Sequence, residues 1–282
     1  MKIRKRFLPR TPADCGAFFF VLFMVPSTYW FELFIVLPAM YTPMSFWYII
    51  HFICGTFIMV NITSNFLAIV LADSSINGEL MPSTIEPNNR FCSVCETIAP
   101  PRSWHCDVCK TCILKRDHHC MFTGCCIGHF NHRYFIVFVL YVFLGALYSS
   151  YFNCFFVWNI LDFTSPLTLL KFVFPLAMII FDLDASEKQC YLLLFIINLL
   201  ATVFTGALLW FHGDLVLKGI VTYEKNHHIA DYDLGKKENI KVVFGKRWYI
   251  AWLFPFIVSE LPHDGIKWTP NNLIRTEGIK NR

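Results

Sequence analysis

The chain has 282 residues, of which 56% are hydrophobic and only 16% are charged, and its formal net charge is +4. A soluble domain of this length needs more charged residues to cover its surface, so the composition excludes an ordinary water-soluble fold. The small positive charge does not require a nucleic-acid partner, because membrane topology and anionic lipid headgroups account for it. We therefore expect membrane lipid, and no nucleic acid, around this chain.

Long apolar runs predict four membrane-spanning helices, because about 20 residues at about 1.5 Å each cross a hydrocarbon layer of about 30 Å. The runs cover residues 17–37, 46–72, 134–161 and 191–212. A shorter run over residues 169–181 contains Lys171 and Pro175, which favours a re-entrant or interfacial segment. The run after the basic N-terminus is too long for a cleaved signal peptide, so we expect a retained first span.

Basic residues indicate the orientation of the spans. With four spans, 22 of the 24 Lys and Arg residues lie on one side, and only Lys171 and Lys188 lie on the other. The positive-inside rule places the basic side in the cytosol. The remaining segments are then a cytosolic N-terminus (1–16), a cytosolic cysteine-rich domain (73–133), a lumenal loop (162–190) and a cytosolic tail (213–282) with an interfacial stretch (248–258).

The expected cytosolic domain contains eight of the twelve cysteines. Thiols stay reduced in the cytosol, so such a cluster indicates metal binding or catalysis rather than disulfides. Paired Cys-x-x-Cys steps favour tetrahedral zinc, and a segment with few apolar residues needs a metal for stability. The pattern reads Cys92-x2-Cys95, His105-Cys106-x2-Cys109-x2-Cys112, Asp117-His118-His119-Cys120, then Cys125-Cys126.

The cluster contains more ligands than two zinc ions need. Two tetrahedral ions take about eight ligands, whereas the eight cysteines with His105, His118 and His119 make eleven. Neighbours such as His118 and His119 point in different directions, so each pair is expected to serve two purposes. Spacing alone does not say which member of a pair is the ligand. We find no internal repeat.

Residues 92–135 resemble the Asp-His-His-Cys cysteine-rich domain of the membrane protein S-acyltransferases, the palmitoyltransferase family. Further likeness lies in Cys126-x-Gly128-x-x-Asn131, in Val221-Thr222-Tyr223-Glu224, which is similar to the family's Thr-Thr-x-Glu motif, and in Asn239. The resemblance covers most of the chain and implies a mainly α, polytopic membrane protein. Its cytosolic two-zinc domain would contain short β-hairpins.

The resemblance also implies roles for individual residues. One zinc would take Cys92, Cys95, His105 and Cys112, and the other Cys106, Cys109, His119 and Cys126. Cys120 would then be the free nucleophile, His118 its general base and Asp117 the residue that orients His118. A long-chain acyl group, such as palmitate, would pass from acyl-CoA to Cys120 and then to a cysteine of a protein substrate.

Several residues depart from the family pattern. Residues 121–125 (Met-Phe-Thr-Gly-Cys) replace the usual Pro-Trp-Val-Asn-Asn, so Phe122 stands at the position expected near the thioester. Thr222 is expected to brace Asp117, and Asn239 to have an inner structural role. The departures are typical of a divergent animal branch of the family. They leave open the alternative of a catalytically weak or inactive membrane zinc scaffold.

Other polar residues are expected to be ordinary surface groups. These include the histidines His129, His132, His227 and His228. Lys115, Arg116, Arg133 and Arg247 are expected to face solvent or headgroups, with coenzyme A phosphates as the alternative. A location in the endoplasmic reticulum or Golgi is what the family resemblance implies.

Overall fold

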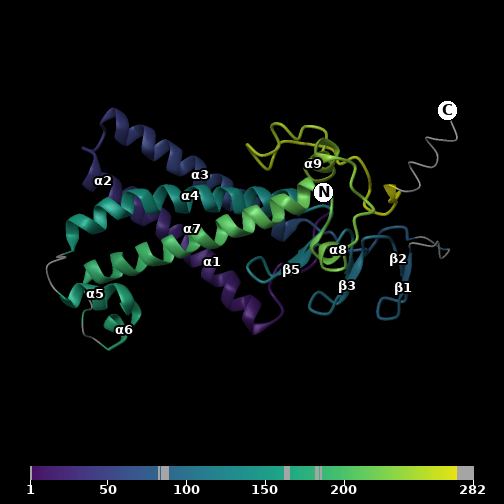
Figure 1. The fold of residues 1–282 in the computed structure, drawn as a ribbon, viewed down its shortest axis with the longest axis horizontal. Coiled ribbons are helices and arrows are strands. Elements are labelled where there is room, and N and C mark those ends of the chain that lie inside the picture. The colour runs from purple at the N-terminus through teal and green to yellow at the C-terminus, as the bar shows by residue number, and fades with distance from the viewer. Residues whose placement is uncertain are drawn as a thin grey trace. The chain divides into compact units, whose positions relative to one another are not determined.

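The structure is a computed structural model that describes residues 2–81, 83, 89–161, 166–181, 184 and 186–271. Four of its helical segments are long and apolar enough to cross a membrane, which fits a multi-pass membrane protein (Figure 1). The predicted mainly helical membrane fold with small hairpins is therefore confirmed. The segments are α1 (Pro12–Phe31) continued by η1 (Glu32–Val36) and α2 (Leu37–Met40), then α3 (Phe46–Leu71), α4 (His132–Ile160) and α7 (Glu187–Leu217).

The shorter apolar run forms two short helices, α5 (Pro166–Val173) and α6 (Pro175–Ile180). Pro175 begins the second helix, as proline commonly does at a first helical turn. Neither helix is long enough to span a bilayer, and a re-entrant or interfacial position stays a prediction. Parts of the beginning of the expected cytosolic domain and of the expected lumenal loop lie outside the described residues, as do the last eleven residues.

The chain divides into two compact units. The helical unit comprises Leu22–Ile62 and Val139–Leu209. Within it, the buried carboxylate of Glu32 accepts hydrogen bonds from Ser149 and from Asn153 Nδ2. Polar groups in apolar surroundings need such partners, since no water is present to replace them.

The cysteine-rich unit comprises Met1–Val21, Thr63–Phe138 and Trp210–Arg282. It contains three antiparallel hairpins and the short helices α8 (Thr222–Asn226) and α9 (Lys236–Phe244). After α9, residues 248–258 form turns and leave Tyr249, Trp252 and Phe256 exposed. The hairpins pair β1 (Arg90–Cys92) with β2 (Thr97–Ala99), β3 (Trp104–Cys106) with β4 (Thr111–Ile113), and β5 (His118–Cys120) with β6 (Cys125–Ile127).

The three hairpins are copies of one geometry. Their first strands end at Cys92, Cys106 and Cys120, which follow one another at intervals of 14 residues, and each hairpin has a four-residue turn. The last turn residues, Glu96, Lys110 and Gly124, all have positive φ angles of 50°, 56° and 60°. The expectation that the chain has no internal repeat was therefore wrong. The repeat preserves backbone geometry and a few cysteines, whereas most side chains differ, so inspection of the sequence missed it.

A short motif connects the third hairpin to α4. The side chain of Asn131 accepts a hydrogen bond from the Gly128 amide at 2.8 Å and donates one to the Cys126 carbonyl at 3.0 Å. A Cβ atom on Gly128 would lie 2.7 Å from the Leu114 carbonyl oxygen, so only glycine fits this close approach. The Cys-x-Gly-x-x-Asn spacing thus fixes the hairpin against the start of the helix.

Candidate active site and metal centres

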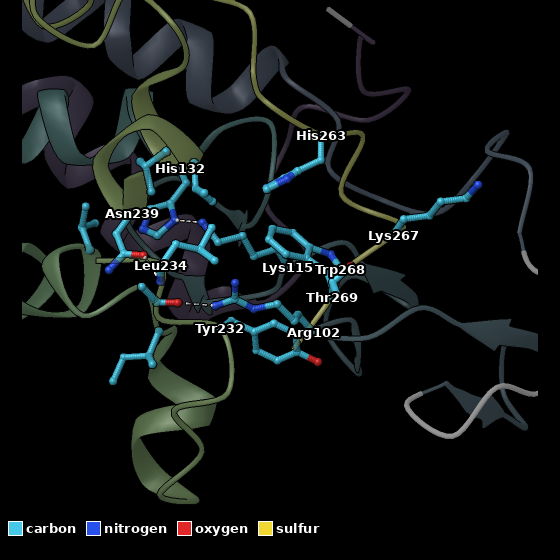
Figure 2. Close-up of a pocket in the computed structure, with 15 residues that line it drawn as sticks. Arg102, Lys115, His132, Tyr232, Leu234, Asn239, His263, Lys267, Trp268 and Thr269 are labelled. Atoms are coloured by element: carbon cyan, nitrogen blue, oxygen red, sulfur yellow. Dashed lines mark hydrogen bonds between the residues drawn. The ribbon is translucent and has the colours of Figure 1, made fainter. Parts of the chain in front are cut away.

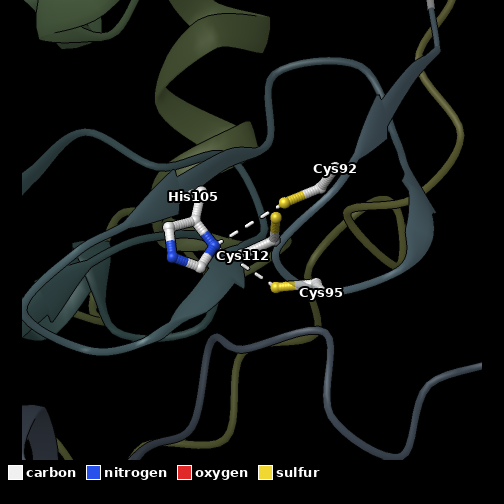
Figure 3. A group of neighbouring side chains, drawn as sticks. All are labelled: Cys92, Cys95, His105 and Cys112. Atoms are coloured by element: carbon white, nitrogen blue, oxygen red, sulfur yellow. Dashed lines mark hydrogen bonds between the residues drawn. The ribbon is translucent and has the colours of Figure 1, made fainter.

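The first metal-ligand group joins the first two hairpins. The β3–β4 register places His105 opposite Cys112, while the first hairpin supplies Cys92 and Cys95. His105 Nδ1 lies 3.6 Å from Cys92 Sγ and 3.3 Å from Cys95 Sγ. All four ligand atoms lie within 4.8 Å of one another and turn toward a common point (Figure 3).

The second group joins the second and third hairpins. His119 Nδ1 lies 3.7, 3.4 and 3.6 Å from the sulfur atoms of Cys106, Cys109 and Cys126, and the last two sulfurs are 3.7 Å apart. Zn–S bonds of about 2.3 Å and Zn–N bonds of about 2.0 Å in a tetrahedron give S···N edges of about 3.6 Å and S···S edges of about 3.8 Å. Both groups therefore have the ligands and spacing to hold zinc.

A buried carboxylate from the N-terminal helix supports the second group. His119 Nε2 donates a hydrogen bond to Asp14 in α1 at 3.2 Å. Such a bond fixes the ring so that Nδ1 faces the sulfur atoms. The sequence carries no signal for this contact, because Asp14 precedes His119 by 105 residues.

Strand β5 separates metal binding from the remaining thiol. Successive side chains of a strand point to opposite faces, so His118 and Cys120 share one face while His119 takes the other. The other hairpins have Cys95 and Cys109 as their third turn residue, but the third hairpin has Thr123 there. Cys120 is buried and belongs to neither sulfur group.

The carboxylate of Asp117 orients His118. His118 Nδ1 donates a hydrogen bond to Asp117 Oδ2 at 2.6 Å. The backbone amide of Thr222 and its hydroxyl donate to Oδ1 at 2.8 and 3.1 Å. His212 Nδ1 lies 3.4 Å from Oδ2. Burial alone would raise the pKa of Asp117, but its contacts with His118 and His212 hold the pKa well below the usual value, so the carboxylate is ionised.

His118 and Cys120 shift each other's pKa values in opposite directions. Burial alone would lower the pKa of His118, but its hydrogen bond with Asp117 and its interaction with Cys120 raise the pKa to about 9. Burial alone would raise the pKa of Cys120, but the interaction with His118 outweighs it and lowers the pKa of the thiol. Cys125 lies opposite Cys120 on the same face, and burial raises its pKa to about 11, so it stays protonated. Of these two thiols, Cys120 is therefore the one that ionises more easily.

Residues 85–229 match the family model of the DHHC palmitoyltransferases. The chain belongs to the DHHC palmitoyltransferase family. It is 34% identical over 224 residues to the probable palmitoyltransferase ZDHHC24 of Danio rerio, which covers 79% of this chain and 76% of the relative. The mouse (Mus musculus) protein of that name is 33% identical over 231 residues, and the match covers 76% of this chain and 77% of the relative. The human (Homo sapiens) protein is 32% identical over 224 residues, and the match covers 75% of each chain.

The family expected from the sequence is thus confirmed. The family model and the relatives indicate protein S-palmitoyltransferase activity, and they do not favour the alternative of an inactive scaffold. In this DHHC protein, Thr222 contacts Asp117 through its backbone amide and its hydroxyl. Glu224 forms a buried ion pair with Arg102, with two hydrogen bonds of 2.7 Å.

The structure also describes the other two expected supporting residues, Asn239 and Phe122. Asn239 donates to the Leu217 carbonyl at 2.9 Å and accepts from the Leu234 amide at 2.9 Å, so it connects α7 to the loop before α9. Phe122 is half-buried in the turn after Cys120. His212, which contacts Asp117, was missed, because its only sequence signal is a histidine at the end of an apolar run.

Two of the four histidines expected on the surface are buried instead. His129 and His132 are each 1% exposed, whereas His227 and His228 are exposed as expected. The C-terminal segment covers His129, whose Nε2 donates to the His263 carbonyl at 2.9 Å. Lys115 and Arg133 are also buried. The expectation of solvent-facing groups failed because it took no account of a C-terminal segment that packs back over the hairpins.

Proposed function

We propose that this protein moves a long-chain acyl group from acyl-CoA to cysteine thiols of proteins through an acyl-Cys120 intermediate. The observation that carries the proposal is the alternation of β5, which puts Cys120 and the Asp117–His118 pair on the face opposite the sulfur group. A thiol beside an oriented imidazole is the usual arrangement for nucleophilic acyl transfer.

In the first half-reaction, the Cys120 thiolate attacks the thioester carbonyl carbon of acyl-CoA. A bond forms between Cys120 Sγ and that carbon, and the carbon–sulfur bond to coenzyme A breaks. The leaving thiolate takes the proton from the His118 imidazolium. Because Nδ1 of His118 donates to Asp117, the proton moves from Nε2. Asp117 stabilises the positive charge before transfer and keeps the ring oriented afterwards.

In the second half-reaction, His118 takes the proton of a substrate cysteine, whose sulfur attacks the acyl-Cys120 carbonyl. Cys120 leaves as a thiolate and the starting state is restored. Each step exchanges one thioester for another, so little free energy is lost. A serine nucleophile would form a more stable oxygen ester and stall the second step.

The metal ions have a structural role in this proposal. One zinc would bind Cys92, Cys95, His105 and Cys112, and the other would bind Cys106, Cys109, His119 and Cys126. Bound zinc supplies folding free energy to hairpins that have little apolar core. Thr222 would brace Asp117, Asn239 would fix the segment that carries Thr222, and Phe122 would border the acyl group.

The membrane arrangement completes the proposal. The distribution of Lys and Arg supports four spans with both termini and residues 73–133 in the cytosol, in the endoplasmic reticulum or Golgi membrane. The reacting thiol would then meet acyl chains from the bilayer and proteins at its cytosolic face. A glycosylation acceptor introduced after Ser186 should be modified in cells, and one introduced after Lys236 should not; the reverse pattern would refute the orientation.

The decisive experiment compares the purified protein with its Cys120→Ser variant. Radiolabelled palmitoyl-CoA should label the unaltered protein through a hydroxylamine-sensitive bond, and the variant should show no such label. Cys125→Ser serves as the matched control, because it alters a buried thiol on the same hairpin and should keep the label. Equal labelling of protein and Cys120→Ser would remove Cys120 from the mechanism. An unlabelled protein with intact zinc content would favour the inactive scaffold.

A further inference from the structure

A pocket of about 180 Å³ lies in the cysteine-rich unit, outside the group formed by Asp117, His118 and Cys120. Figure 2 shows side chains from the hairpins, from the start of α4, from the segment around α9 and from the C-terminal segment gathered around it. A water molecule takes about 30 Å³ in the liquid, so the pocket has room for a polyatomic ligand. The polar residues that line the pocket include Arg102, Lys115, His132, Tyr232, His263 and Thr269.

The lining of the pocket contains Arg102, Lys115 and Lys267 but no aspartate or glutamate. Lys115 is 3% exposed and forms no ion pair with any carboxylate in the part of the chain that the structure describes. Its ammonium instead lies 3.5 Å from His132 Nδ1. Burial, and then the charge of Arg102, lower the pKa of Lys115 to about 7, although the carboxylates of Glu224 and Asp117 oppose this shift. An ammonium group buried in this way is unfavourable unless an anion joins it.

Two histidines add buried ring nitrogens that lack hydrogen-bond partners among the described residues. When Lys115 is an ammonium it has only N–H groups, so His132 Nδ1 accepts in their contact and the neutral ring carries its proton on Nε2. That buried Nε2 has no hydrogen-bond partner among the described residues. The Nε2 atom of His263 has none there either. Buried polar groups in native proteins are nearly always paired, so these atoms point to a missing acceptor.

Arg102 lines the pocket, but its positive charge is already paired. Its guanidinium is neutralised by Glu224 and lies between the rings of Tyr232 and Trp268, with its carbon 4.6 and 4.7 Å from their centres. Lys267 stands at the edge with its ammonium directed away from the other lining groups (Figure 2). Lys115 is therefore the interior cation that has no ion-pair partner among the described residues.

We propose that this pocket binds a phosphate monoester group, with the ammonium of Lys115 and the Nε2–H of His132 as its main donors. A phosphoryl group has several oxygens that can accept from separate donors at once, which suits one ammonium and two ring nitrogens. Lys267 and Thr269 are exposed, so the ligand can enter past the C-terminal segment. The proposal does not depend on acyl transfer, since it concerns binding alone.

Binding is tested by thermal unfolding of the zinc-loaded, detergent-solubilised full chain in rising concentrations of inorganic phosphate. Chloride and acetate at equal ionic strength correct for general salt effects. Phosphate should raise the melting temperature saturably, and Lys115→Met should weaken the apparent affinity by about tenfold or more. Lys246→Met is the matched control, because Lys246 is exposed and pairs only with the exposed Glu260. It should bind phosphate as the unaltered protein does.

A second variant covers the case in which Lys115→Met does not fold. His263→Leu alters a half-buried residue at the same pocket and should also weaken phosphate binding. The proposal is overturned if phosphate acts no better than chloride or acetate, or if both pocket variants that fold bind it as tightly as Lys246→Met.

Further probes identify the source of the phosphate group. Inorganic phosphate, dioctanoyl phosphatidate and coenzyme A are compared, with dephospho-coenzyme A as the control that lacks the 3′-phosphate. If phosphatidate stabilises the protein and the effect depends on Lys115, the ligand is a lipid headgroup. If coenzyme A does so but dephospho-coenzyme A does not, the ligand is the acyl donor. Stabilisation by inorganic phosphate alone indicates a free phosphate ion. If no probe stabilises the protein in a Lys115-dependent way, the pocket is not a phosphate site.

Discussion

The second and third hairpins share a register and a turn, yet the cysteine that ends the first strand belongs to a metal-ligand group in the second hairpin and to none of the sulfur groups in the third. Cys106 and Cys120 occupy equivalent positions, as do Cys109 and Thr123. In the second hairpin, the turn cysteine joins the first cysteine around one metal. In the third, threonine offers no second sulfur, and the first cysteine stays free. Replacement of one ligand in a repeated metal-binding turn thus accounts for the candidate nucleophile.

Because the third hairpin has two opposite faces, a few residues can supply both metal ligands and a free thiol. His119 and Cys126 pair across the strands and face the sulfur group, while Cys120 and Cys125 pair on the other face. A metal on one face would therefore hold the strand that presents His118 and Cys120 on the other. The order of the second and third hairpins should therefore depend on the same metal ion.

Removal of one sulfur from the second group should have the largest effect. Cys109→Ser should release the zinc of that group, and both hairpins should lose order because a structural zinc contributes roughly 10–16 kcal/mol of folding free energy. We expect lower zinc content, rapid proteolysis between residues 90 and 130, and no acyl labelling. The Cys125→Ser control should keep its zinc. Full zinc content with normal labelling in Cys109→Ser would contradict the structural role of the group.

Removal of the Asp117 charge, which acts on His118 and not on the sulfur groups, should impair catalysis but leave the bound zinc in place. Asp117→Asn should lower the rate of acyl labelling by about 10³-fold or more, because the amide cannot stabilise the imidazolium of His118. The unaltered protein should lose activity as the pH rises through about 9, where His118 loses its proton. Without the carboxylate, which raises the pKa of His118, this loss should shift to lower pH.

The pH profile of Asp117→Asn is measured alongside its zinc content. A variant that binds two zinc ions and keeps both its rate and its alkaline limit would show that Asp117 does not act through His118. Thr222→Val provides a smaller, related change, since it removes the hydroxyl at 3.1 Å but leaves the backbone amide at 2.8 Å from the same oxygen.

A cysteine introduced at the third turn position of the third hairpin should make this hairpin resemble the second one chemically. Thr123→Cys places a sulfur where Cys109 stands in its hairpin, so Cys120 should be committed to a metal or a disulfide. We expect labelling to fall by about tenfold if nine tenths of Cys120 is occupied in this way. A reductant should restore the part of the labelling that is lost to a disulfide. Thr123→Ser is the control, and an equal loss there would mean that the hydroxyl geometry, not the added sulfur, matters.

Sequence patterns were sufficient for the parts of this molecule that depend on local residues. The apolar runs predicted the four long helices, because length and hydropathy are properties of a contiguous segment. The cysteine spacing and the family resemblance led to the same two ligand groups that the structure brings together. The pairing of His118 with Asp117 was also expected, since the two residues are neighbours.

Contacts between distant segments could not be predicted in this way. His212 reaches Asp117 from the end of α7, and the C-terminal segment covers His129 and surrounds Lys115. Those residues looked like surface groups, because nothing nearby in the sequence indicates which chain will pack over them. Even the 14-residue repeat emerged only from the strand registers, which show that Thr123 is equivalent to Cys109.

The smallest expected effect compares the partners of the two zinc-ligand histidines. His119 donates to the buried Asp14, whereas the Nε2 of His105 lies 3.9 Å from Asp107, whose side chain is 97% exposed. A buried partner restricts the ring, while a solvated one competes with water. Asp14→Asn should therefore weaken zinc binding by about tenfold, and Asp107→Asn should leave it unchanged. Competition with a chelator measures both affinities, and labelling at saturating zinc should be normal in each variant. Equal zinc affinity in the two variants would mean that Asp14 does not hold His119 in place, so the sulfur atoms alone would set the strength of the second group.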